Sequence, residues 1–180
     1  MIDYQEILKD KLMSSNNPEW LERYNHSLGV TRTALALNKE LKLGLNEDKV
    51  YLAAILHDYA KFDGFDRCKE IVEKYNLDKE ILNISHKLWH SFFGPYIIND
   101  ELGIDDKEIL DAIRYHTTGK PNMNVLEEVI FLSDYIEEGR IGEGFEIARR
   151  VAFEEKNLKK AVAIELDNLI KHLKSINKTV

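Results

Sequence analysis

Six residues of types that bind metal ions recur at positions predicted to face the interior of helices. They are His26, His57, Asp58, His90, His116 and Asp134. His26, for example, is followed at helical spacing by Val30 and Ala34, and Asp134 follows Ile130. Residues three, four and seven positions apart share one face of a helix. The apolar neighbours therefore predict that these polar side chains point into the core.

The aspartates are the most informative members of this set. A buried carboxylate without a partner is unstable, so an inward aspartate must be neutral, paired or bound to a metal ion. Asp58 follows His57 directly and is rotated by about 100° from it on a helix, so one helix can present two adjacent ligands. Imidazoles and carboxylates from different helices can meet in a bundle core, where dinuclear metal sites occur. The six residues together predict a metal centre.

Each residue taken alone has a simpler interpretation. A single histidine on an apolar stripe is usually a hydrogen-bonded core residue, and Asp134 alone could cap a backbone group or pair with an arginine. His86 lies one turn before His90 and is an alternative for its role. His172, in a polar C-terminal segment, is most simply a surface residue. The metal centre is thus predicted from the whole set, because six such placements by accident are improbable.

Length and composition indicate one ordinary globular chain. The 180 residues fit a single domain, with a motif core at about 20–140 and C-terminal helices at about 143–176. The net charge of -7 argues against a general nucleic-acid binder but leaves room for a small phosphorylated ligand in a local basic pocket. Cys68 is the single cysteine, and no apolar stretch has the length of a membrane span. We expect a cytoplasmic protein without nucleic-acid or membrane partners.

All the elements that position these residues are predicted to be helices. There are three prolines and no convincing run of alternating apolar and polar residues. Asn17 ahead of Pro18 predicts an N-cap with proline at the first helical position. The expected helices cover about residues 2–13, 18–43, 47–60, 67–75, 79–83, 87–101, 105–116, 125–137, 146–152 and 158–176. The predicted fold class is an all-α helical bundle with a buried metal site.

Four blocks of sequence, in order, resemble the HD superfamily of metal-dependent phosphohydrolases, and more narrowly its YqeK-type members. The blocks are Arg23–Gly29, Leu56–Lys61, Ile113–Gly119 and Asp134–Glu137, the last followed by Gly139 and Arg140. The resemblance extends from about Trp20 to about Ala161. It implies a helical HD domain and an iron-binding hydrolase that cleaves diadenosine tetraphosphate symmetrically into two molecules of ADP.

The resemblance also implies roles for individual residues. The principal metal ligands would be His26, His57, Asp58 and Asp134, with His90 and His116 as candidates for a second metal position. Catalysis would involve Asp58, Lys61, His90 and His116, and contacts with the nucleotide would involve Arg23, Lys61, His90, His116, Thr117 and Arg140. The cofactor would be one or two divalent ions, iron above all. Imidazole and carboxylate ligands leave manganese, zinc and others open.

The role of Thr117 and the identity of the binding partner each have alternative interpretations. Thr117 lies in the break after His116, where hydroxyl and amide groups can meet phosphate oxygens, although a simple helix C-terminal turn is an equally good interpretation. The predicted partner is a dinucleoside polyphosphate, with ADP as the product, and a homodimer is left open. The alternatives are another HD reaction on nucleoside mono- or triphosphates, a nucleotide-binding module without turnover, and a helical adaptor whose inward polar groups hydrogen-bond one another.

Overall fold

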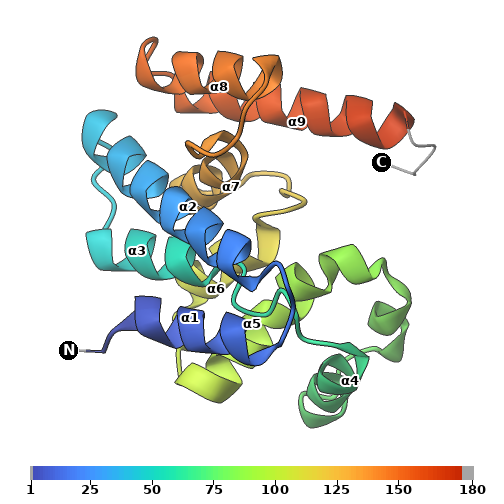
Figure 1. Ribbon diagram of the computed structural model, residues 1–180. Helices are drawn as coiled ribbons and strands as arrows, with labels where there is room; N and C mark the ends of the chain where they lie inside the picture. The colour runs from blue at the N-terminus through green and yellow to red at the C-terminus, as the bar shows by residue number, and fades with distance from the viewer. Residues whose placement is uncertain (1, 176–180) are drawn as a thin grey trace.

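The computed structural model describes residues 2–175, which form nine α-helices and two short 3₁₀ helices and contain no β-strand (Figure 1). The helices are α1 (Tyr4–Ser14), α2 (Trp20–Glu40), α3 (Glu47–Leu56), α4 (Phe65–Lys74), η1 (Lys79–Asn83), η2 (His86–Leu88), α5 (Trp89–Leu102), α6 (Lys107–Tyr115), α7 (Val125–Ile136), α8 (Glu143–Phe153) and α9 (Leu158–Ser175). The predicted all-α fold class is confirmed. None of the described helices is long and apolar enough to cross a membrane.

Several helices begin where a polar side chain caps the first turn. Asp3, Asn46, Asp106 and Asn124 each accept a hydrogen bond from a backbone N–H at the start of the helix that follows. Asn124 also forms a reciprocal capping box with Glu127. Because the first backbone N–H groups of a helix have no partner within it, these side chains fix where each helix starts.

The start of α2 differs from the prediction. The expected cap by Asn17, with Pro18 at the first helical position, is wrong. The helix begins at Trp20, and Glu19 at the N-cap makes no capping hydrogen bond with its side chain. Asn17 Oδ1 instead accepts a hydrogen bond from the Glu19 N–H at 2.9 Å. The asparagine therefore closes a turn one step ahead of the helix, where Asx turns compete with helix capping.

The end of α3 also differs, and it matters for the site. The helix was expected to continue to about residue 60, but it ends at Leu56. The Tyr59 N–H donates to the Leu56 carbonyl at 3.0 Å, and the Lys61 N–H donates to the Asp58 carbonyl at 2.9 Å. Bonds to the third preceding residue belong to a tighter winding than the α-helix. His57 and Asp58 therefore lie in a turn at the end of α3.

The core lies between α2, α3, α6 and α7, which pack on one another around the region of the predicted metal site. Leu37, Ile55, Phe93, Ile113 and Ile130 are fully buried there. In Figure 1, α8 and α9 run side by side at one end, packed on α7, while α4 and α5 lie towards the opposite end. α5 packs on α6 and adds Phe93, so five helices direct side chains towards this core.

Candidate metal centre and substrate pockets

The six predicted residues come together in space from five helices. His26 is on α2, His57 and Asp58 are at the end of α3, His90 is in the first turn of α5, His116 follows α6, and Asp134 is in the last turn of α7. The ring centroids lie 5.3 Å apart for His26 and His57, 5.0 Å for His57 and His116, and 5.1 Å for His90 and His116. The four imidazoles form one continuous cluster.

Two overlapping groups within this cluster could hold metal ions. One ligand atom from each of His26, His57 and Asp134 lies within 4.8 Å of the others, and the same holds for His57, Asp58 and His116. His57 belongs to both groups. His26 Nε2 is 2.9 Å from Asp134 Oδ1, and His57 Nε2 is 3.5 Å from Asp58 Oδ2. Imidazole nitrogens with carboxylate oxygens suit divalent transition metals.

Unpaired buried atoms show that this donor set fits a metal ion. His26 Nε2, His57 Nε2 and Asp58 Oδ1 are buried and make no hydrogen bond of good geometry within residues 2–175. The closest neighbour of His26 Nε2 is another acceptor, Asp134 Oδ1 at 2.9 Å. Buried polar atoms without a partner are rare because each loses its contact with water without replacement. Coordination by a cation would satisfy all three at once.

The other ring nitrogens orient the imidazoles. His57 Nδ1 lies 2.7 Å from the Ala54 carbonyl oxygen, and His116 Nδ1 lies 2.6 Å from that of Ile113. A carbonyl only accepts, so each Nδ1 carries a proton, and Nε2 is the nitrogen left to offer a lone pair when the ring is neutral. The helix ends therefore fix the tautomer in which both histidines can bind a metal ion through Nε2.

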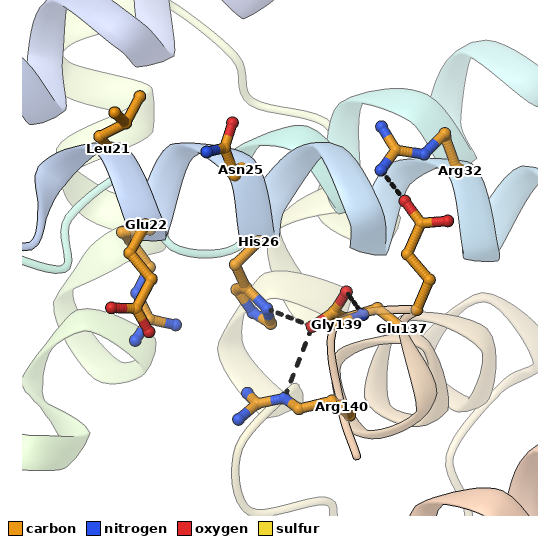
Figure 2. A pocket seen from close by; sticks show the side chains of 10 residues that line it. Leu21, Glu22, Asn25, His26, Arg32, Glu137, Gly139 and Arg140 are labelled. Atoms are coloured by element: carbon orange, nitrogen blue, oxygen red, sulfur yellow. Dashed lines mark hydrogen bonds and ion pairs between the residues drawn. The ribbon is translucent and has the colours of Figure 1, made fainter.

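Glu137 orients His26 in the same way. Its Oε1 lies 3.3 Å from His26 Nδ1, and its Oε2 accepts a hydrogen bond from the Gly139 N–H at 2.7 Å. Figure 2 shows His26 and Arg140 both directed at this carboxylate. A Cβ atom on Gly29 would lie 2.6 Å from Oε2. A larger residue at this position of α2 would therefore displace the carboxylate, because it approaches the Gly29 backbone so closely.

Replacement of Gly29 by alanine tests this arrangement. Gly29→Ala is expected to displace the Glu137 carboxylate and weaken metal affinity roughly 10- to 100-fold, the usual cost of losing a partner that orients a ligand. Metal competition against a chelator measures the affinity. Gly64→Ala is the matched control, since a Cβ atom there meets nothing within 4 Å. Equal metal affinities for the two folded variants would rule out this role of Glu137.

The site holds its carboxylates in the ionised form. Burial raises the pKa of Asp58, but the neighbouring His57 imidazole, the Lys61 ammonium group and the His90 imidazole more than offset this and hold that pKa well below its ordinary range. Burial also raises the pKa of Asp134, but the neighbouring His26 and His57 imidazoles reverse the direction and lower it. The cluster therefore presents two negative charges to a cation.

Basic side chains surround the Asp58 carboxylate. Arg23 Nη1 lies 2.9 Å from Asp58 Oδ2, and Lys61 Nζ lies 3.4 Å from Oδ1 and 3.2 Å from His90 Nε2. Burial lowers the pKa of His90 to about 3, although the Asp58 carboxylate opposes this shift. His90 is therefore neutral near pH 7, with its Nε2 3.2 Å from Asp58 Oδ1 and from His116 Nε2.

The remaining predicted residues lie at the rim of this cluster or away from it. Arg140 Nη2 is 3.4 Å from Asp134 Oδ1, and Thr117 lines a pocket beside His116. His86 is exposed on η2, so the geometry favours His90 over His86. His172 is an exposed residue of α9, as predicted.

Two pockets adjoin the cluster. The first has a volume of about 610 Å³ and is lined by residues that include Arg23, His26, Glu137 and Arg140 (Figure 2). The second, of about 410 Å³, lies between α7, α8 and α9 and reaches His116 and Asp134. Arg140 lines both. Both volumes fall in the range of about 300–1,000 Å³ typical of ligand pockets.

The sequence analysis missed Glu165, Asn168 and Phe145 in the second pocket. One signal for Glu165 was present, because it continues a stripe of Ala161 and Val162 on the last helix, as Asp134 continues an apolar stripe of its own. Glu165 is 7% exposed in the structure. Phe145 and Asn168 lie on segments where the sequence carries no comparable signal.

Glu165 is expected to make stability depend on pH. Burial raises its pKa well above the ordinary value, the Asp134 charge adds to this, and Arg140 opposes it. The stabilising contribution of this group is fully present below its pKa in the unfolded chain. That contribution is lost as pH rises through its higher pKa in the folded protein. Between about pH 5 and pH 8, metal-free Glu165→Gln should therefore gain stability relative to the unmodified chain, by at most about 1.4 kcal/mol per pH unit.

Urea unfolding in the presence of a chelator measures this difference. Glu154→Gln, which changes an exposed residue after α8, is the matched control and should show no such trend. A constant difference between Glu165→Gln and the unmodified chain across this pH range would contradict a raised pKa of Glu165.

Comparison with known proteins shows the family of the chain. Residues 23–139 match the HD domain, and the chain belongs to the HD-domain family. It is similar to proteins named symmetrical bis(5′-nucleosyl)-tetraphosphatase. The one from Bacillus subtilis (strain 168) is 39% identical over 88% of this chain and 83% of its own length. The one from Halalkalibacterium halodurans is 40% identical over 88% of this chain and 82% of its own length.

A solved structure has the same fold. The crystal structure of a predicted HD superfamily hydrolase involved in NAD metabolism, from Clostridium acetobutylicum, matches 100% of this chain and 92% of that chain. Its TM-score is 0.84 and its sequence identity is 34%. The resemblance to HD hydrolases predicted from the four sequence blocks is therefore confirmed.

Proposed function

We propose that the protein hydrolyses diadenosine tetraphosphate symmetrically and releases two molecules of ADP. The observation that carries this function is the cluster of free Nε2 and carboxylate atoms, next to Arg23 and Lys61, in a chain whose relatives bear the name of this activity. The site supports a divalent metal ion. The protein is accordingly a hydrolase of phosphoanhydride bonds.

We assign iron as the metal ion, held by His26, His57, Asp58 and Asp134, with His90 and His116 at a second metal position. Such ions supply Lewis acidity towards phosphoryl oxygens and a nucleophile at neutral pH. The neutral His90 imidazole next to Asp58 is consistent with a second position, since a protonated histidine cannot bind a metal ion. Elemental analysis of protein purified without added metal would test the assignment to iron.

The basic residues would bind the phosphate chain. Arg23 and Lys61 place a guanidinium and an ammonium group beside Asp58, and Arg140 lies where the two pockets meet. Cationic donors at fixed positions stabilise the charge that develops on phosphoryl oxygens during transfer. If the second metal position is empty, His90 and His116 would instead be available to accept or pass a proton near the reacting phosphate. The leaving group in symmetric cleavage is ADP.

Product analysis tests this function. Metal-loaded protein should convert diadenosine tetraphosphate to ADP as the sole product, and chelation should stop the reaction; chromatography resolves the nucleotides. AMP together with ATP would overturn symmetric cleavage. Slow turnover of this substrate beside rapid phosphate release from nucleoside mono- or triphosphates would favour a different HD reaction. Tight nucleotide binding without product would indicate a binding module.

We also propose that residues 1–180 act as one domain in the cytoplasm, with a small nucleotide as partner and without nucleic acid or membrane. The net charge of -7 and the buried, unpaired Cys68 support this setting. A homodimer stays a prediction, which light scattering after gel filtration would test.

A further inference from the structure

The second pocket shares Arg140 with the larger one. It reaches the metal centre at His116 and Asp134, whereas the larger pocket reaches it at His26. A dinucleoside polyphosphate has two nucleosides joined by a phosphate chain, and symmetric cleavage breaks the middle of that chain. Such a substrate needs one pocket for each half, with the reacting phosphates between them. The two pockets flank the centre in this way.

One wall of the second pocket is aromatic and held in place. The ring centroids of Tyr135 on α7 and Phe145 on α8 are 4.7 Å apart, and the rings are inclined by 56°. The Asn168 side chain donates a hydrogen bond to the Tyr135 hydroxyl at 2.8 Å. A Cβ atom on Gly144 would lie 2.9 Å from that hydroxyl and 3.0 Å from the Asn168 nitrogen. Nucleotide bases of any kind can stack on aromatic side chains such as these.

An unpaired polar group lies in the same pocket. Glu165 on α9 lines it and is 7% exposed, and its Oε2 makes no hydrogen bond within residues 2–175. A buried oxygen without a partner is costly unless a ligand supplies one. The exocyclic amine of a purine is a donor that such an oxygen can accept from. Thr117 Oγ1, likewise unpaired among the described residues, lies in the same lining near His116.

We propose that this pocket binds one nucleoside of the substrate, with the base against Tyr135 and Phe145 and its amine edge towards Glu165. The other nucleoside occupies the larger pocket beside His26, and Arg140 contacts the phosphate chain between them. Glu165 is then a specificity-determining residue. This assignment rests on the proposed hydrolysis of a dinucleoside tetraphosphate.

Two pairs of variants test the pocket through the kinetics of diadenosine tetraphosphate hydrolysis. Glu165→Leu removes the hydrogen-bonding group, whereas Glu165→Gln keeps a side chain that accepts and donates. We expect Glu165→Leu to raise KM roughly tenfold with kcat within about threefold, and Glu165→Gln to retain KM within about threefold. Phe145→Ala should raise KM similarly, and Ile147→Ala, an exposed neighbour on α8, should not.

ADP binding measured by calorimetry provides a readout that does not depend on turnover. Both Glu165→Leu and Phe145→Ala should weaken ADP binding, and both folds are checked by circular dichroism. Unchanged KM and unchanged ADP affinity in these two variants would overturn the second nucleoside pocket while leaving symmetric hydrolysis intact. An inactive unmodified protein would overturn the proposed function instead, and the ADP affinities would still decide whether this pocket binds a nucleotide.

Discussion

Asp58→Asn is expected to lower kcat for diadenosine tetraphosphate by about 10³-fold or more, beyond the 10- to 100-fold typical of partners that only orient a ligand. Asp58 is 1% exposed, and its carboxylate is a member of one of the two potential metal-binding groups. Asparagine keeps the shape but removes the negative charge. The variant should therefore lose metal as well as turnover, because a neutral amide is a much weaker ligand for a divalent ion.

The same substitution should change the stability of the metal-free chain. Arg23 Nη1 at 2.9 Å and Lys61 Nζ at 3.4 Å would face an amide in place of a carboxylate. Removing one partner of a buried ion pair leaves the other uncompensated and costs about 3–5 kcal/mol when the charges cannot reach water. Arg23 and Lys61 are about a quarter exposed, so we expect a smaller loss here.

Metal analysis, initial rates and urea unfolding of the same preparations measure these effects. Asp10→Asn, which changes an exposed aspartate of α1, is the matched control and should behave like the unmodified protein. A folded Asp58→Asn variant that retains its metal and its turnover would remove Asp58 from the metal centre.

Lys61→Met is expected to lower kcat by about 10²- to 10³-fold with its metal content unchanged, the size of effect seen when one fixed donor to a developing negative charge is removed. Lys61 Nζ lies within 3.4 Å of Asp58 Oδ1 and 3.2 Å of His90 Nε2. The turn that ends α3 holds the backbone of this residue through its N–H bond to the Asp58 carbonyl. The ammonium group is therefore placed before the substrate arrives.

Lys61→Arg distinguishes charge from shape at this position. An arginine keeps the positive charge with a different reach, so part of the lost kcat should return. Lys79→Met, at an exposed position of η1, is the control for loss of a lysine. A normal kcat in Lys61→Met would exclude Lys61 from the reaction, and a loss of metal in that variant would indicate a structural effect on the cluster instead.

The arrangement of pockets bears on the choice between HD reactions. A nucleoside mono- or triphosphate needs one nucleoside pocket beside the metal centre. Among the described residues, two pockets of about 610 and 410 Å³ adjoin the centre, and Arg140 lines both. The second pocket therefore favours a dinucleoside polyphosphate over the nucleoside mono- and triphosphates that the sequence left open as substrates.

Local patterns in the sequence were sufficient to predict the helices and the six residues that cluster in the structure. A helix repeats every 3.6 residues, so an inward His26 or Asp134 is visible from its neighbours alone. The four ordered blocks were sufficient for the family, which the HD match over residues 23–139 confirms. Where the prediction was wrong, at Pro18 and at the end of α3, side-chain hydrogen bonds and tight turns prevailed over helix periodicity.

Only the tertiary structure decided which distant side chains contact these six residues. Glu137 faces His26 across 111 positions of sequence, and its close approach to Gly29 exists only when α2 meets the end of α7. The second nucleoside pocket likewise forms from residues of α7, α8 and α9 that no local pattern connects. Periodicity reports which face of a helix is buried, but the partner of each buried group depends on how distant helices pack.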